Sequence, residues 1–318
     1  MPRLLPTPLA ALAAAALAAC GGDASTERSA RGPRANVVAV ASGPAALLAG
    51  ALVGGELVRS VAPAGTRMAD WRPDDEAIRG MVDARRLLVV GGEFEPWLQR
   101  TSVPPSRTVA LSDLVPGTKR IEVGAIEHTH GDGESHSHGG VVPTIWTDPA
   151  QLRAAIDALA ESLPAALDGV ERANLQAPRA ALLERVAAYE ASLAELGAVA
   201  AGRPVIATDH GLEYVARAAE LGLEVALLEL DGDGPPNDQG VRDLERLAKD
   251  SGSHAGVLVW PGPIDAAFAE RVREQLGLVS VHFDLGGEIS APDEGDALER
   301  LTASVEALRG AIQESRPR

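Results

Sequence analysis

The chain of 318 residues is poor in cysteine, in aromatic residues and in positive charge. Its single cysteine, Cys20, cannot form an intrachain disulfide, so no disulfide framework supports the fold. Aromatic residues make up 3% of the chain although 46% is hydrophobic, so the core must consist mainly of Leu, Val, Ile and Ala. The net charge of −16 argues against nucleic acid as a partner, because that affinity comes largely from neutralising phosphates.

Several enzyme motifs are also missing. The sequence contains no Gly-x-Ser-x-Gly elbow, no P-loop and no His-Glu-x-x-His helix. The only cysteine lies in the leader described below, which leaves no thiol nucleophile. We therefore expect a binding protein and not an enzyme; the enzyme alternative is a metal hydrolase built on His210 and nearby acids.

The N-terminus has the layout of an export signal. "MPRLLPTPLAALAAAALAAC" combines a charge at Arg3 with an apolar stretch and then small residues. The apolar span from Leu9 to Ala19 is too short to cross a bilayer as a stable helix. "LAAC" resembles the lipobox of bacterial lipoproteins, which implies cleavage after Ala19 and acylation of Cys20. The alternative is an ordinary signal peptide with a chance cysteine. The lipoprotein interpretation places the exported protein in the cell envelope, anchored to the membrane by lipidated Cys20.

Two groups of four short apolar runs alternate with helical patterns. Such runs are typical of buried parallel strands, and the segments between them are typical of helices that cover a sheet. The predicted strands are residues 36–42, 56–63, 87–92, 107–112, 204–209, 224–230, 256–262 and 279–285. We therefore predict an α/β fold with two lobes, each built on a mainly parallel sheet.

The middle of the chain, residues 148–200, has no strand signal. "DPAQLRAAIDALAESL" opens with Asp-Pro, a favourable helix start, and a second helical pattern follows it. A long helix between two lobes would act as a stiff linker, and a cleft between the lobes is the expected ligand site. The predicted organisation is a signal peptide at 1–19, a flexible Gly/Ser-rich tether at 20–35, an N-terminal lobe at 36–175 with a His-rich loop at 126–140, a linking helix at 176–201 and a C-terminal lobe at 202–318.

The His-rich loop, "IEHTHGDGESHSHGG", holds four of the seven histidines. They are His128, His130, His136 and His138. Imidazole is the commonest metal ligand in proteins, and short His-rich tracts are typical of metal binding. We expect the loop to capture Zn(II), and Ni(II) or Cu(II) also suit such ligands. The alternative is a solvated, low-complexity loop without a ligand.

Five phrases together resemble the zinc and manganese substrate-binding proteins of bacterial ABC transporters, the cluster 9 family. They cover roughly residues 36–312 in the family's order: "VAPAGTRMADWRPDDEAI", "GGEFEPWLQR", "VVPTIWTDPAQL", "TDHGLEYVARAAELGL" and "VHFDLGG". The resemblance implies two lobes joined by a long helix and a cleft that holds Zn(II), Mn(II) or another divalent ion. It also implies ABC permease and ATPase subunits in the membrane as partners.

The ligand positions that the resemblance implies are only partly filled by ligand residues. Aligned on the flanking motifs, the three ligand histidines fall on Ala69, Thr144 and Asp209, and the acidic ligand falls on Asp284. Alanine has no donor atom, and a threonine hydroxyl is a poor ligand for Zn(II). Asp209, its neighbour His210 and Asp284 end predicted strands, where open α/β sheets bind ligands. These three residues form either a rebuilt, oxygen-rich metal site or a vestigial one.

Two binding functions are compatible with these patterns. The first is a lipid-anchored receptor that passes Zn(II) or a similar ion to a permease, with the His-rich loop as collector and the cleft as a transfer site. The second is a divergent binding module that kept the fold, lost the metal, and holds another small ligand or a protein partner.

Overall fold

The computed structural model describes residues 35–115, 117, 120–123, 126–129, 135–138, 140–201, 203–228, 238–250, 256–262, 265–291 and 293–315. The predicted signal peptide, Cys20, the tether up to residue 34 and the loop histidine His130 lie outside the described residues. Among the helices that are described, none combines the length and the apolar character that crossing a membrane requires.

The first sheet has four parallel strands in the order β2-β1-β3-β4. The strands are β1 (Ala35–Val40), β2 (Val58–Ser60), β3 (Ala84–Val89) and β4 (Thr108–Ala110). The helices of this part are α1 (Gly43–Val53), α2 (Asp75–Asp83) and the short α3 (Leu111–Leu114). Val38, Val40 and Leu88 are buried in the central strands, as the apolar runs predict.

The second sheet repeats this arrangement in the order β10-β9-β7-β8, again with parallel pairing. Its strands are β7 (Pro204–Ala207), β8 (Gly222–Val225), β9 (Val257–Trp260) and β10 (Val279–His282). Its helices are α6 (Glu213–Ala218), α7 (Asp238–Asp250) and α8 (Ala266–Leu276). The predicted class, α/β with two mainly parallel sheets, is confirmed.

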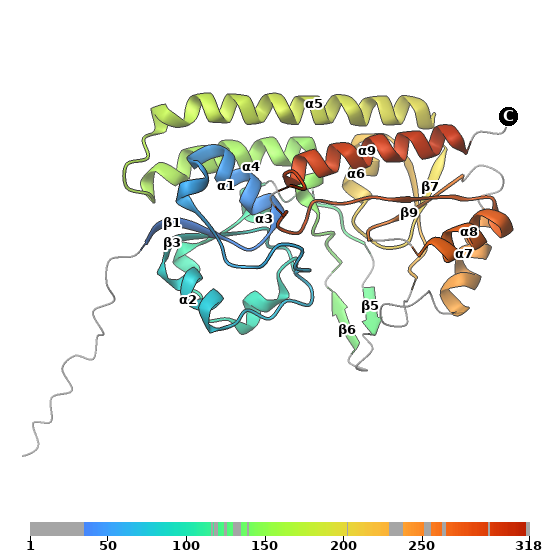
Figure 1. Ribbon diagram of the computed structural model, residues 1–318, viewed down its shortest axis with the longest axis horizontal. Helices are drawn as coiled ribbons and strands as arrows, with labels where there is room; N and C mark the ends of the chain where they lie inside the picture. The colour runs from blue at the N-terminus through green and yellow to red at the C-terminus, as the bar shows by residue number, and fades with distance from the viewer. Residues whose placement is uncertain are drawn as a thin grey trace, which may run out of the picture. The chain divides into compact units, whose positions relative to one another are not determined.

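Three long helices join the two sheets through one apolar core. They are α4 (Pro149–Ser162), α5 (Gln176–Ala200) and α9 (Ala297–Glu314). α5 lies beside both α4 and α9 (Figure 1). Its buried side chains recur every three or four positions, at Leu182, Val186, Tyr189, Leu193 and Leu196. Because this stripe belongs to the same cluster as Val38 of β1 and Val257 of β9, α5 packs into a core that both sheets share.

The His-rich segment forms a two-stranded antiparallel ribbon where the sequence predicts a loop (Figure 1). Its strands are β5 (Ile126–Thr129) and β6 (Ser135–His138). The register pairs His128 with His136 and Ile126 with His138. The sequence gives no hint of these strands, because the segment lacks the alternation of apolar and polar residues that marks a half-buried strand.

Candidate functional site

Three of the four expected ligand positions lie in segments that meet one another. The hydroxyl of Thr144 donates a hydrogen bond to the carbonyl of Gly211 at 2.8 Å. The indole N–H of Trp146 donates to the carbonyl of Leu285 at 2.7 Å. A Cβ atom built on Gly211 would lie 2.9 Å from Leu285 Cδ1, so the backbone passes close to this side chain. The fold thus brings the neighbours of Asp209 and Asp284 against Thr144.

The segment after Asp284 continues to the other sheet. Gly43 at the start of α1 donates its N–H to the carbonyl of Gly287 at 2.9 Å, and Gly65 donates to Ile289 at 3.0 Å. A Cβ atom on Gly43 would lie 2.3 Å from the carbonyl oxygen of Gly286, so only glycine fits there. These contacts hold the two sides of the candidate site together through backbone atoms of the protein itself.

The first two positions offer no ligand of the usual kind. Ala69 lies in an exposed turn before α2 and carries no donor atom. Thr144 is 5% exposed, and its hydroxyl proton is used in the bond to Gly211. A neutral hydroxyl held in this way is a weak partner for Zn(II). These two positions therefore differ from the histidines that the resemblance implies.

Asp209 and His210 lie just beyond β7, and the histidine has a partner that the sequence analysis missed. Asp209 is exposed and accepts the backbone N–H of His210 at 2.7 Å. Nδ1 of His210 pairs with Oε1 of Glu213, and the N–H of Gly211 donates to Oε2 at 2.7 Å. The bond to Glu213 raises the pKa of His210 above its ordinary value, and this outweighs the opposing effect of burial. Burial alone would raise the pKa of Glu213, but the bonds from His210 and Gly211 lower it.

Asp284 lies two residues beyond β10, and both of its carboxylate oxygens have partners. Oδ1 accepts the N–H of Gly286 at 2.7 Å, and Oδ2 pairs with Nη1 of Arg300 at 3.1 Å. Ser304 of α9 exchanges hydrogen bonds with the backbone N–H and carbonyl of Asp284. Asp284 is thus fixed against the first half of α9. Arg300 pairs with the carboxylate that the resemblance assigns to the metal.

The segments that carry the three predicted cleft ligands therefore meet through their neighbours, but the ligand side chains do not form a cluster. Within the described ranges, no three His, Cys, Asp or Glu side chains are arranged so that they could hold a metal ion. The assignment of Asp209, His210 and Asp284 as ligands stays a prediction. The partners Glu213 and Arg300 were missed for different reasons. Glu213 follows His210 by three positions, a spacing that could have suggested the pair, whereas nothing local links Arg300 to Asp284.

A buried acid supports the adjoining loop of the first sheet. Glu95, from the phrase "GGEFEPWLQR", is 2% exposed and accepts the N–H groups of Val90 at 2.8 Å and Gly91 at 2.9 Å. Burial raises the pKa of Glu95 to about 7 although both N–H groups favour its charged form. The side chain is too enclosed to meet a solute, so it stabilises the loop after β3.

Stability should consequently fall as the pH rises through the titration range of Glu95. The folded pKa is raised above the ordinary carboxyl value of 4.5, so the folded state holds its proton more tightly than the unfolded state. The free energy of unfolding therefore decreases from about pH 4.5 to about pH 7, by about 3 kcal/mol for this group alone. Urea unfolding at pH 5 and pH 8 measures the difference. Glu95→Gln should flatten this dependence, and Glu171→Gln, at an exposed position, should keep it. An unchanged slope in Glu95→Gln would contradict the assignment.

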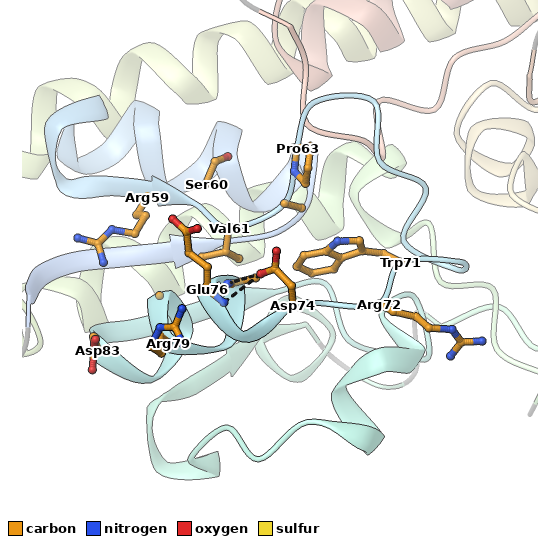
Figure 2. A pocket seen from close by; sticks show the side chains of 13 residues that line it. Arg59, Ser60, Val61, Pro63, Trp71, Arg72, Asp74, Glu76, Arg79 and Asp83 are labelled. Atoms are coloured by element: carbon orange, nitrogen blue, oxygen red, sulfur yellow. Dashed lines mark hydrogen bonds between the residues drawn. The ribbon is translucent and has the colours of Figure 1, made fainter. Parts of the chain in front are cut away.

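A cavity of about 550 Å³ lies elsewhere, between the end of β2 and helix α2 (Figure 2). Trp71 forms one wall, and Asp74 caps α2 by accepting the N–H groups of Glu76 and Ala77 at 3.0 and 2.8 Å. Arg59, Arg79 and Glu76 also line it, so the cavity carries both cationic and anionic groups. None of the four expected ligand positions lines it, and we assign it no role in metal binding.

Solved structures share this fold at low sequence identity. Zn(II)-bound AdcA from Streptococcus pneumoniae is 15% identical with a TM-score of 0.68, over 90% of this chain and 59% of AdcA. The chain thus spans less than two thirds of AdcA. The metal-dependent lipoprotein YcdH from Bacillus subtilis is 14% identical with a TM-score of 0.70, over 86% of this chain and 98% of that one. FpvC from Pseudomonas aeruginosa, in complex with Mn2+, is 16% identical with a TM-score of 0.68, over 88% and 99%. At these identities the likeness shows the fold.

The family follows from the sequence itself. No curated protein matches the chain. The profile of the family described as zinc-uptake complex component A, periplasmic, matches residues 38–311, which is most of the chain. Proteins of this family are substrate-binding proteins, so the expectation that the chain is not an enzyme is confirmed. The match agrees with the two parallel sheets and with the order of the five motif phrases, and the chain belongs to the family of periplasmic zinc-uptake component A proteins.

Proposed function

We propose that this chain is the exported solute-binding protein of an ABC importer for a divalent cation. Zn(II) is the first candidate for the cargo, and Mn(II) or another divalent ion is the alternative. The family match over residues 38–311 supports a role in metal uptake at the cell envelope. The proposal includes an anchor at lipidated Cys20, and delivery of the ion to separate permease and ATPase subunits in the membrane.

The observation that carries this proposal is the register of the β5–β6 ribbon. His128 and His136 are direct partners across the two antiparallel strands. Residues that are direct partners in an antiparallel pair lie opposite each other on neighbouring strands, so the backbone register brings two histidine positions together. The ribbon thus offers a histidine pair, which a structureless loop would have to order at an entropic cost.

In this proposal the cleft between the sheets is a site of lower affinity. Asp209, His210 and Asp284 would receive the ion from the ribbon and pass it on. Two observations support a low affinity: Ala69 and Thr144 provide no imidazole, and His210 and Asp284 already hold Glu213 and Arg300. A weak cleft site suits transfer, because an ion that is bound too tightly is not released.

The second candidate function is a binding module on the same fold that has lost the metal. The partners of the cleft residues favour it, since Thr144, His210 and Asp284 are each engaged within the protein. The cleft would then hold another small ligand, or the surface a partner protein. Binding of an organic solute by a metal-stripped sample would favour this candidate over the first.

Binding of Zn(II) to the metal-stripped protein should weaken by at least tenfold between pH 8 and pH 5. Imidazoles ordinarily titrate near pH 6.5 and must lose their proton to bind a metal, so acid competes with the ion. Carboxylates remain largely ionised over this range, and a site made of acids alone would respond less. Competition with a chromophoric chelator at the two pH values measures the change. Equal affinity at both would exclude a site built on histidines.

A further inference from the structure

The surroundings of Asp284 are those of a carboxylate that has already received a cation. Its oxygens accept from Gly286 N at 2.7 Å and from Nη1 of Arg300 at 3.1 Å, so neither is left without a partner. The second terminal nitrogen of the guanidinium, Nη2, donates to the backbone carbonyl of Glu288. The guanidinium therefore bridges Asp284 and the segment that crosses to the first sheet.

Arg300 is the more buried member of this pair. Its side chain is 12% exposed, whereas that of Asp284 is 33% exposed. Its Nε is buried and has no hydrogen-bond partner within the part of the chain that the structure describes. A guanidinium so far removed from water depends on Asp284 for compensation of its charge, because an unpaired buried charge is strongly unfavourable. The contact is thus built into the fold and is not an incidental surface ion pair.

A second acid adjoins the same guanidinium. Burial raises the pKa of Glu288, and the charge of Asp284 raises it further, while Arg300 and Arg67 oppose the change. Glu294 raises it as well, so two acids and two arginines act on Glu288 at this side of the candidate site. Without Arg300, the negative charges of Asp284 and Glu288 would be offset less, because Arg67 is exposed. Oxygen ligands of this kind attract divalent cations.

We propose that Arg300 acts as a built-in cation that competes with the divalent ion for Asp284 and so keeps the cleft's affinity low. This assignment rests on the proposed function, and it names the residue that sets the cleft's selectivity. An incoming ion must displace the guanidinium from Oδ2 of Asp284. Until the guanidinium moves, its positive charge repels the ion. This competition would make the cleft a weak site although an acid occupies the ligand position that the resemblance implies.

The test compares Arg300→Gln with its parent in a full-length background without the four histidines of residues 126–140, so that only the cleft is measured. This background carries the substitutions H128N, H130N, H136N and H138N. Zn(II) titrated into the metal-stripped Arg300→Gln variant should bind about tenfold more tightly or better, the scale on which a nearby charge alters a carboxylate. Adding Asp284→Asn should abolish the gain. Arg300→Lys, which keeps the charge, should bind like the parent.

A matched control removes Arg185, an arginine of α5 that pairs with the acid at the N-cap of α9. Arg185→Gln breaks the pair with the helix cap Asp296, at 2.7 and 2.6 Å, and should leave the cleft's affinity unchanged. The proposal is overturned if Arg300→Gln binds no more tightly than its parent, or if the gain survives Asp284→Asn. Urea unfolding checks that each variant is folded.

Should Arg300→Gln fail to fold, Arg300→Met, which keeps much of the side chain's length without its charge, takes its place. The proposal predicts the same gain of about tenfold, and an affinity equal to the parent's would overturn it. The two proposals fail separately. A protein with an intact ribbon that binds no Zn(II) would remove the proposed function, whereas the Arg300 result is read in the background without the four histidines of residues 126–140.

Discussion

Replacing His128 and His136 together with asparagine should weaken the binding of Zn(II) by about 100-fold or more. The two residues are register partners in the β5–β6 ribbon, so the double substitution removes both members of one histidine pair. Loss of a residue that merely orients a metal ligand costs roughly 10–100-fold, and loss of two direct ligands should cost at least as much. Asparagine keeps a polar side chain of moderate size, so the free energy of unfolding should change little. Competition with a chelator measures the affinity, and urea unfolding measures the stability.

Two controls test whether the loss of affinity comes from this histidine pair or from the removal of any histidine. His282→Asn removes an exposed imidazole at the end of β10, far along the chain from the ribbon, and should leave the affinity unchanged. His128→Asn alone should produce most of the loss, because one imidazole cannot replace two. If the double variant binds as tightly as the natural protein, the ribbon is not the collector, and the ion binds elsewhere in the protein.

Replacing Asp148 with alanine should lower the free energy of unfolding by about 3 kcal/mol. Asp148 is the N-cap of α4 and accepts the N–H groups of Ala150 at 2.8 Å and Gln151 at 3.1 Å. Loss of such a cap costs about 1–2 kcal/mol. The other carboxylate oxygen pairs with Arg217 of α6, so alanine also removes this ion pair, in which Asp148 is 9% exposed and Arg217 is 40% exposed. The ion pair connects α4, which follows the first sheet in the chain, to α6, which lies between strands of the second sheet.

Two further variants divide this loss. Asp148→Asn keeps the capping acceptor and removes the charge, so it should cost less than Asp148→Ala. Arg217→Gln should cost about 1 kcal/mol or less, because Arg217 is 40% exposed and water screens the pair. Urea unfolding of the three variants measures these differences. Equal losses in Asp148→Ala and Asp148→Asn would show that the cap contributes nothing, contrary to the two hydrogen bonds.

The sequence predicts the framework because buried parallel strands are marked locally. All eight predicted strands overlap an observed strand, since an apolar run followed by a turn signal identifies each of them. The observed strands are mostly shorter than predicted. Asp209 and Asp284 consequently lie two residues beyond β7 and β10, in loops whose direction depends on their contacts and not on strand geometry. The approximate place of the site was therefore predictable, but the orientation of its side chains was not.

The partners within the site depend on contacts that no local pattern reveals. Arg300 is an ordinary residue of an amphipathic helix until α9 packs beside Asp284. Thr144 meets Gly211 across a long stretch of chain, through a backbone carbonyl that has no sequence signature. The β5–β6 register is likewise invisible in a segment of histidine, serine and glycine. The departures at Ala69 and Thr144 were readable from the sequence, whereas the arginine that stands at Asp284 was not.

The most direct measurement is a calorimetric titration of Zn(II) into the metal-stripped full-length protein and into a version that lacks residues 128–138. The account predicts tight binding by the intact protein and only weak binding after the deletion, because the ribbon collects the ion and Arg300 keeps the cleft weak. Tight binding of one ion by the shortened protein would contradict this account and would place a working metal site at Asp209, His210 and Asp284.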